Sequence, residues 1–424
     1  MKKIQNLSIA ILTDIVVNGL TFKSSIDRHL SKEELEPVDK KAISSLVGTA
    51  LRHYLSLNSS VNHFFNDVSQ ENKCALIILL CNKVFTKALD LDSAKEETVK
   101  LLKAEDVEFN ESYFNDVIDS IEEKADLLPR NLKDGSPDAL AFRYNTPNWL
   151  VKMWIKNFGL KTTYRLLHAN CKSPLNIYRV NETRADIEEV LNNSDFERYE
   201  VEGFVSYNGK DQIRNTNEYR LRRILNSTPV FKYIFDKVDI DAMNSIAVYS
   251  DIAINQLLVE MLVRFGNRRQ FEIMSGNGES FLKNKKILEN FRFNNAHIYE
   301  AKVSSTITVL SNPVNVFFLF PDSSRFADIR TNPDFFIHFK RDSLDGLING
   351  QKDALNEIAP FIENGGQLVY GVPTLNNKES KNLIQEFLIA HQEFVLVEEK
   401  QFFPFDPYNG SFYFALLKKV EKDD

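Results

Sequence analysis

The sequence predicts a multidomain chain: an all-α bundle, then a small α+β domain, then an α/β domain with a mainly parallel sheet. Three observations lead to this prediction. Residues 1–128 show only helical spacings of apolar residues, the pattern becomes mixed from Thr146 onward, and strands alternate with helices after residue 236. Such alternation is typical of a parallel sheet whose faces are covered by helices.

The N-terminal region reads as a compact bundle of about five to seven helices. Residues 46–55 carry an apolar stripe at helical spacing, and residues 74–85 are almost wholly apolar, which is typical of a helix at the centre of a bundle. Asn110 is placed to cap a helix over residues 113–121. Proline, glycine and polar residues then indicate a linker over residues 129–145.

The middle region, residues 146–235, mixes both periodicities. Thr146 followed by Pro147 predicts the start of a helix that ends at Gly159. Residues 176–181 and 200–207 read as strands, with a short helix between them. We therefore expect a small α+β domain.

The C-terminal region, residues 236–424, alternates between strands and helices. Helices are expected over residues 251–265, from 279, and over 344–361 and 378–391, and a turn is expected at residues 364–366. The strands expected between them are residues 246–249, 270–274, 297–300, 314–320, 367–371, 393–398 and 411–417. The last two strands are compatible with an antiparallel edge on a parallel sheet.

The composition excludes several classes of protein. Lys plus Arg (52) against Asp plus Glu (59) gives a net charge of −7, so any nucleic-acid contact requires a local basic patch. Only three cysteines occur, which excludes a disulfide framework and favours a reducing cytoplasm. No apolar run approaches the roughly 18 residues of a membrane-spanning helix, so we expect a soluble protein with no membrane partner.

One strand–turn–helix segment has the character of a cofactor site. Residues 272–278 end a strand in a turn with two glycines, which allow close approach of a ligand, and a helix N-terminus follows. An acid suited to ribose hydroxyls lies one strand further on, so the candidate cofactor-binding residues are Glu272, Ser275, Gly276, Gly278 and Glu300. An ordinary βα turn explains the same spacing equally well. The sequence has no phosphate-binding P-loop and no paired His or Cys spacing, so no metal site is expected.

A basic stretch stands out in this acidic protein. Guanidinium groups beside an aromatic ring suit single-stranded or looped RNA, through phosphate pairing and base stacking. The candidate RNA-binding residues are Arg179, Asn181, Arg184, Arg214, Arg220, Arg222 and Arg223, with Tyr219 interleaved. A solvated helix face is an equally good explanation.

The order of these parts resembles the Sun/Fmu-type 16S rRNA cytosine-C5 methyltransferases, nearly from end to end. The resemblance rests on residues 46–53 (similar to LVxGxLRH), 114–118 (VNAVLR), 144–150 (xSxPxWL), 174–181 (PPLxLRVN), 332–334 (HPD), 365–370 (GGxLVY) and 410–413 (DGFFxA). It implies a NusB-like RNA-binding bundle over residues 1–128, an N1-type RNA-binding domain over 146–235, and a Rossmann-like domain for S-adenosyl-L-methionine (AdoMet) over 236–424.

The sequence departs from this family in its catalytic motifs. The cofactor loop DxCAAPGGKT aligns with residues 272–281, where Glu279 replaces the second glycine and Ser280 the lysine. The family motif DAPCSGxG aligns with residues 319–324, so its aspartate is Leu319 and its cysteine is Asp322. The TCS motif aligns with residues 372–374, so its cysteine is Pro373.

These replacements have a chemical meaning within the resemblance. The TCS cysteine of the family adds to C6 of cytosine and thereby activates C5, and the second cysteine assists product release. Since Asp322 and Pro373 provide no thiolate, we assign no catalytic residue and expect covalent catalysis to be absent. A negative side chain at Glu279 predicts weak or absent AdoMet binding.

Three hypotheses follow. The leading one is a catalytically degenerate family member that still binds ribosomal RNA or a ribosomal subunit precursor. The second is an active AdoMet-dependent RNA methyltransferase that uses chemistry without cysteine, for instance on a ring nitrogen. The third is a NusB-like protein-interaction module.

Overall fold

The computed structural model describes residues 2–31, 33–105, 109–127, 132–133, 135–172, 174–239, 245–266 and 268–421. It forms two compact units. One comprises Met1–Thr163 with Ile329–Lys340, and the other comprises Tyr164–Asp328 with Arg341–Asp424. Each unit is described by itself below.

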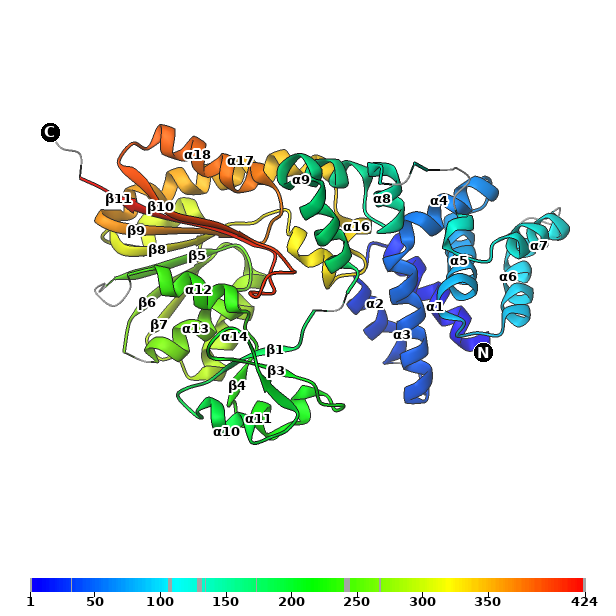
Figure 1. Ribbon diagram of the computed structural model, residues 1–424, viewed down its shortest axis with the longest axis horizontal. Coiled ribbons are helices and arrows are strands. Elements are labelled where there is room, and N and C mark those ends of the chain that lie inside the picture. The colour runs from blue at the N-terminus through cyan, green and yellow to red at the C-terminus, as the bar shows by residue number, and fades with distance from the viewer. Residues whose placement is uncertain are drawn as a thin grey trace. The chain divides into compact units, whose positions relative to one another are not determined.

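The first unit is helical (Figure 1). Its α-helices are α1 (Lys2–Val16), α2 (Phe22–Leu30), α3 (Pro37–Arg52), α4 (Tyr54–Phe64), α5 (Gln70–Cys81), α6 (Leu91–Glu105), α7 (Glu111–Ser120), α8 (Pro137–Arg143) and α16 (Phe335–His338). Helix α5 packs against α1, α3, α4 and α6, and every residue from Cys74 to Cys81 is buried, as expected for a central helix. The side chain of Asn110 accepts a hydrogen bond from the Tyr113 N–H and caps α7, as the sequence predicts. Helix α8 lies inside the predicted linker, of which residues 129–131 and 134 are outside the described residues.

A segment distant in sequence completes this unit. The buried carboxylate of Asp334 accepts a hydrogen bond of 2.8 Å from the Phe22 N–H, at the first turn of α2. The rings of Trp149 and Phe339 stack with centroids 6.2 Å apart. Residues 329–340 therefore help to hold the helical unit together, although they follow the fourth strand of the C-terminal sheet.

Helix α9 (Asn148–Asn170) corrects one expectation. The helix does break at Gly159, whose φ of 79° and ψ of 163° are not helical, but a second helical segment continues to Asn170. Glycine is suited to this position because it adopts a positive φ without steric cost.

The second unit contains a small antiparallel sheet in the order β2-β3-β1-β4. The strands are β1 (Ile177–Val180), β2 (Phe196–Arg198), β3 (Phe204–Tyr207) and β4 (Ile224–Leu225), with α10 (Ile187–Leu191) and α11 (Asn217–Arg220) between them. Val180, Val190, Phe196 and Val205 form its core.

The larger sheet of this unit has seven strands in the order β10-β11-β9-β8-β5-β6-β7. The strands are β5 (Ile246–Ser250), β6 (Phe271–Ser275), β7 (Ala296–Glu300), β8 (Val314–Phe320), β9 (Ile362–Val372), β10 (Phe394–Phe402) and β11 (Phe412–Lys419). The five strands β5 to β9 run parallel to one another. Strand β11 lies between β9 and β10 and is antiparallel to both. The predicted fold class, with its parallel sheet and antiparallel edge, is confirmed.

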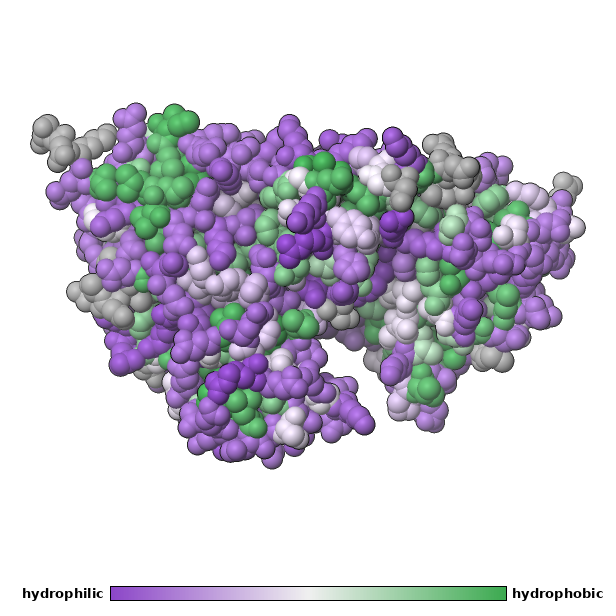
Figure 2. Space-filling model, viewed as in Figure 1, coloured by the Kyte–Doolittle hydropathy of each residue, from purple (hydrophilic) through white to green (hydrophobic). Residues whose placement is uncertain are grey.

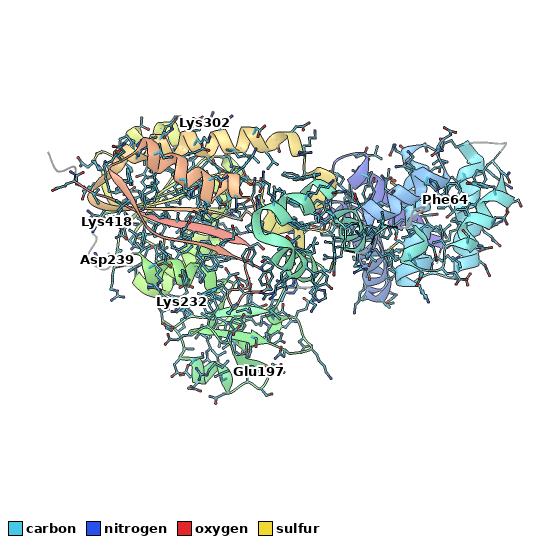
Figure 3. All side chains as sticks on the ribbon, turned by 45° about the horizontal axis from the view of Figure 1, so that its top comes forward. Phe64, Glu197, Lys232, Asp239, Lys302 and Lys418 are labelled. Atoms are coloured by element: carbon cyan, nitrogen blue, oxygen red, sulfur yellow. The ribbon has the colours of Figure 1, made fainter. Side chains whose placement is uncertain are left out.

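Helices cover both faces of this sheet (Figure 1). One layer contains α12 (Pro229–Lys237), α13 (Asn255–Phe265) and α14 (Gly278–Phe291), and the other contains α17 (Leu344–Ile358) and α18 (Lys381–Ala390); the short α15 (Thr306–Val309) follows β7. Along β5, Val248 packs in the first layer and Ala247 and Tyr249 in the second, because successive side chains of a strand point to opposite faces. Lys232 of α12 is labelled in Figure 3. Within this first layer, Lys232 pairs with Asp236, which also pairs with Arg264 of α13.

Two further local expectations are corrected. Residues 364–366 lie inside β9 instead of forming a turn before it, and the register against β8 shifts there, with Gly365 at a φ of 79°. The helix expected from residue 251 begins at Asn255, so residues 251–254 form a loop at the end of β5.

The surface is mostly hydrophilic on the face shown in Figure 2, with an apolar group over α18 and β10. Val395, Leu396 and Val397 are exposed on β10, which is an edge strand. Within the described part of the chain, no helix is long and apolar enough to cross a membrane.

Candidate functional site

The carboxyl edge of the seven-stranded sheet is where a doubly wound fold binds its ligand. The parallel strands end there at Ser250, Ser275, Glu300, Phe320 and Val372. The strand order reverses between β5 and β8, and ligands of this fold class bind in the crevice outside that switch point. The sheet order makes β5 the first strand, β6 the second and β7 the third.

This order corrects the position of the predicted cofactor loop. In doubly wound folds, the glycine-bearing loop follows the first strand and the ribose-binding acid ends the second. The turn with Gly276 and Gly278 follows β6, the second strand, and Glu300 ends β7, the third. The register pairs Ser275 with Glu300, and the Glu300 carboxylate lies against Gly278, 3.2 Å from where a Cβ would be. These residues are close together, but they are one strand away from the first turn.

Glu272 does not belong to that group. It lies in the middle of β6, where its carboxylate is 3.0 Å from the imidazole of His297 on β7. The second strand therefore ends in a serine. Ser275 is fully buried, and its hydroxyl accepts a hydrogen bond of 3.1 Å from the Asn284 amide.

The first βα turn, residues 250–255, contains no glycine and is hydrogen-bonded by the chain itself. The Ser250 hydroxyl accepts from the Ile252 N–H and donates to the Ile252 carbonyl. The Asn284 side chain accepts a hydrogen bond of 3.0 Å from the Ile254 N–H. Asp251 projects into the crevice, and burial raises the pKa of its carboxyl. This turn was not recognised from the sequence, because it lacks the glycines that mark such loops.

The two positions aligned with the family's cysteines come together in space. Asp322 follows β8, Pro373 follows β9, and these strands are neighbours in the sheet. Next to them, the Ser324 and Thr374 hydroxyl oxygens are 2.9 Å apart. The structure places these positions at neighbouring strand ends and adds a polar network beside them.

Glu379 is the centre of this network, and no sequence pattern indicates this role. Its side chain is fully buried and accepts hydrogen bonds from the Ser324 N–H (2.7 Å), the Thr374 hydroxyl (2.7 Å), the Asn376 amide (3.1 Å) and the Gln351 amide (3.2 Å). Each of its oxygens thus has two donors, and no room is left for a substrate group on this carboxylate.

The three cysteines lie elsewhere. Cys74 and Cys81 are buried in α5, and burial raises the pKa of their thiols to about 11 and about 12. Cys171 follows α9 and is exposed. Among the described residues, no cysteine lies at a strand end of the large sheet.

Two of the candidate RNA-binding residues are structural instead. The Arg179 side chain is buried; its Nε lies 3.3 Å from a carboxylate oxygen of Glu260, which is fully buried on α13, and its Nη1 donates to the Gly203 carbonyl. Asn181 is also buried, and its amide donates to the Arg222 carbonyl. A buried cation paired in this way cannot reach a phosphate, so Arg179 and Asn181 are removed from the interface.

The remaining cations lie on the surface. Arg184, Arg214 and Arg220 are exposed, and Arg222 and Arg223 are half-buried. Arg222 adopts a φ of 57°, donates to the Asn290 carbonyl at the end of α14, and lies over the Phe291 ring.

That contact joins the basic stretch to a set of lysines that sequence reasoning missed. Lys283, Lys285 and Lys286 are exposed on α14. Lys286 lies one turn before Asn290, so both are on the same face of the helix. The signal available in the sequence was the run of three lysines in residues 283–286.

Comparison with known proteins shows what the chain resembles. A family model described as Methyltr_RsmF/B-like, ferredoxin-like domain matches residues 146–203. The probable ribosomal RNA small subunit methyltransferase B of Bacillus subtilis (strain 168) is 21% identical over 412 residues, which are 93% of this chain and 90% of that protein. The chain is therefore similar to this methyltransferase over most of its length, and its residues 146–203 match a domain of RsmF/B-like methyltransferases.

Solved structures share the fold of this chain. The crystal structure of PH0851 gives a TM-score of 0.74 at 15% identity and covers 99% of this chain and 98% of its own. A methyltransferase homolog protein from Pyrococcus horikoshii gives a TM-score of 0.57 at 14% identity and covers 68% of this chain and 100% of its own.

The family implies AdoMet as cofactor, and the residues of this chain do not fit it at the first turn. That turn has no glycine, its polar groups bond to one another, and the second strand ends in Ser275 instead of an acid. Among the described residues, no cluster of His, Cys, Asp or Glu is arranged to hold a metal ion.

Proposed function

We propose that this chain is an RNA-binding member of the rRNA methyltransferase family that has lost cysteine-dependent methyl transfer. Its target is expected to be ribosomal RNA or a ribosomal subunit precursor, because the curated relative is named as a ribosomal RNA methyltransferase. The observation that carries the proposal is the contrast between a closed carboxyl edge and an open basic surface within one unit.

The basic surface supports RNA binding through its unneutralised charge. Several of its cations form no ion pair with described residues, although the chain as a whole carries a net charge of −7. These cations are Arg214, Arg220, Arg223, Lys285 and Lys286. Phosphate groups of RNA would neutralise them, and Tyr219, half-buried beside Arg220, offers a ring for stacking.

The carboxyl edge supports the loss of methyl transfer. Cytosine C5 needs a nucleophile at C6 before it attacks a methyl group. The positions aligned with the family's two cysteines hold Asp322 and Pro373, and the side chains around them are occupied with one another. Among the described residues at these strand ends, no thiolate supplies the electron pair that the family's reaction uses.

The experiment measures binding and transfer with the same sample. The full chain is incubated with 16S rRNA and methyl-labelled AdoMet, with an active family member as positive control, and RNA retention is measured in parallel. We expect RNA to be retained without methyl incorporation. Methyl groups on cytosine contradict the proposal, methyl groups on another base establish the non-cysteine enzyme in its place, and no RNA retention leaves the NusB-like interaction module as the better account.

The helical unit fits the same proposal. We propose that residues 1–128 act as a NusB-like RNA-binding domain in the cytoplasm, with residues 146–235 as the N1-type domain and 236–424 as the methyltransferase-type domain. Support comes from the seven α-helices α1 to α7 in the described part of residues 1–128 and from the match of residues 146–203 to the family model.

A further inference from the structure

We propose that Asp251 is a clasp that closes the cofactor crevice of this fold from within, so that the chain takes up no AdoMet. This inference goes beyond RNA binding. It is tested separately, because it concerns cofactor binding at the carboxyl edge and not RNA binding at the basic surface. Asp251 is the first residue after β5, at the switch point where a doubly wound fold receives its ligand.

Four hydrogen bonds hold Asp251 in place. Its Oδ1 accepts from the Tyr249 hydroxyl (2.7 Å), and its Oδ2 accepts from the Asp322 N–H (3.1 Å). Its own N–H donates to the Phe320 carbonyl (3.1 Å), and its carbonyl accepts from the Asn277 amide (2.8 Å). Asp251 therefore connects the carboxyl ends of β5, β6 and β8, which are the three walls of the crevice.

The side chains of the clasp lie directly against Gly276. A Cβ added at Gly276 would lie 1.9 Å from Asp251 Oδ1 and 2.4 Å from the Tyr249 hydroxyl oxygen. Its φ is not positive, so the glycine is required for space and not for backbone conformation. Glycines in a cofactor loop let a ligand approach the backbone. Here the carboxylate of Asp251 occupies the position next to the Gly276 backbone.

Two backbone donors of the first turn are also occupied by the chain itself. The Ile252 and Ile254 N–H groups donate to the Ser250 and Asn284 side chains. Displacing the clasp would therefore break bonds on three strands before any bond to a ligand formed. The free energy needed to break these bonds lowers the apparent affinity of any ligand. We therefore expect no AdoMet binding at physiological concentrations.

The first test is direct titration of the full chain with AdoMet and with S-adenosylhomocysteine by calorimetry. We expect no binding and no shift in unfolding temperature at about 1 mM ligand, because a bound ligand would stabilise the folded state. A dissociation constant in the micromolar range would overturn the proposal, whatever the outcome of the RNA experiment.

The second test asks whether Asp251 is held where the structure places it. We expect Gly276→Ala to lower the unfolding temperature by several degrees, because the added Cβ would force the hydrogen-bonded side chains of Asp251 and Tyr249 away from their positions. Gly346→Ala is the matched control, because a Cβ there meets nothing within 4 Å. In a Tyr249→Phe/Asp251→Ala background the loss should disappear, and in an Asp251→Asn background, which keeps the bulk, it should persist. If Gly276→Ala behaves like Gly346→Ala, or if its loss is the same in all backgrounds, the clasp does not exist.

Discussion

The carboxyl edge of the large sheet and the basic surface of α11 and α14 belong to the same unit, yet their polar groups are used in opposite ways. At the edge, Glu379 has four donors and Asp251 accepts two hydrogen bonds and forms two more through its backbone. On the surface, Arg220 and Lys286 form no ion pair with any described residue. Buried polar groups that are fully paired contribute to stability, whereas exposed unneutralised cations are available to an external polyanion. The comparison therefore separates residues that stabilise the fold from residues that bind.

The largest expected effect is at the edge. Replacing Glu379 with Ala leaves four donors without an acceptor, at about 1 kcal/mol or more each, so we expect the free energy of unfolding to fall by about 4 kcal/mol. Urea denaturation measures this change. The control is Glu386→Ala on the neighbouring α18, whose carboxylate is exposed and pairs with Lys352 at the surface; its effect should stay within about 0.5 kcal/mol. An equal loss of stability in the two variants would contradict the distinction between the edge and the surface.

Two arginines that look alike in the sequence provide a second test of the division between stabilising and RNA-binding residues. Arg179→Ala leaves the fully buried Glu260 without its partner and should cost about 3–5 kcal/mol of stability. Arg184→Ala removes an exposed cation and should change stability by less than about 0.5 kcal/mol. Unfolding by urea, with RNA affinity measured on the folded variants, distinguishes them. If Arg184→Ala destabilised the chain as much as Arg179→Ala, the division between the two regions would be wrong.

A smaller effect concerns the pH dependence of the clasp. Burial raises the pKa of Asp251, so the folded chain holds its proton more tightly than the unfolded chain does. The contribution of Asp251 to stability is therefore present at low pH and is lost as the pH rises through its folded pKa. We expect the stability of the wild type relative to Asp251→Asn to fall as the pH rises above the ordinary pKa range of an aspartate. A difference that does not change with pH would show that Asp251 is not buried in the crevice.

The sequence predicts the elements of this fold well, because their signals are local. The apolar run of α5, the Asn110 cap and the alternating strands each lie within a few residues, and the structure confirms them. The order of strands in the sheet depends on residues far apart in the chain. For this reason the sequence predicts the cofactor loop at the glycines after β6, whereas the sheet order places it after β5.

The site was predicted less well, because its contacts connect distant residues. Arg179 seemed free for RNA, although its partner Glu260 lies 81 residues further along the chain. A signal was present in both neighbourhoods: Arg179 lies between Tyr178 and Val180 in a strand, and Glu260 interrupts an apolar run of α13. Glu379 offers no signal of this kind, since residues 376–380 around it are all polar.

The salt dependence of RNA binding tests the central claim most directly. The affinity of the full chain for a single-stranded rRNA fragment is measured over a range of salt concentrations, for the wild type and for Arg220→Ala/Arg223→Ala/Lys285→Ala/Lys286→Ala. Each lost phosphate contact reduces the slope of log affinity against log salt by about 0.7. We predict a slope shallower by about 2 to 3 in the variant, with an unchanged unfolding temperature. The same affinity and the same slope in both proteins would contradict the account.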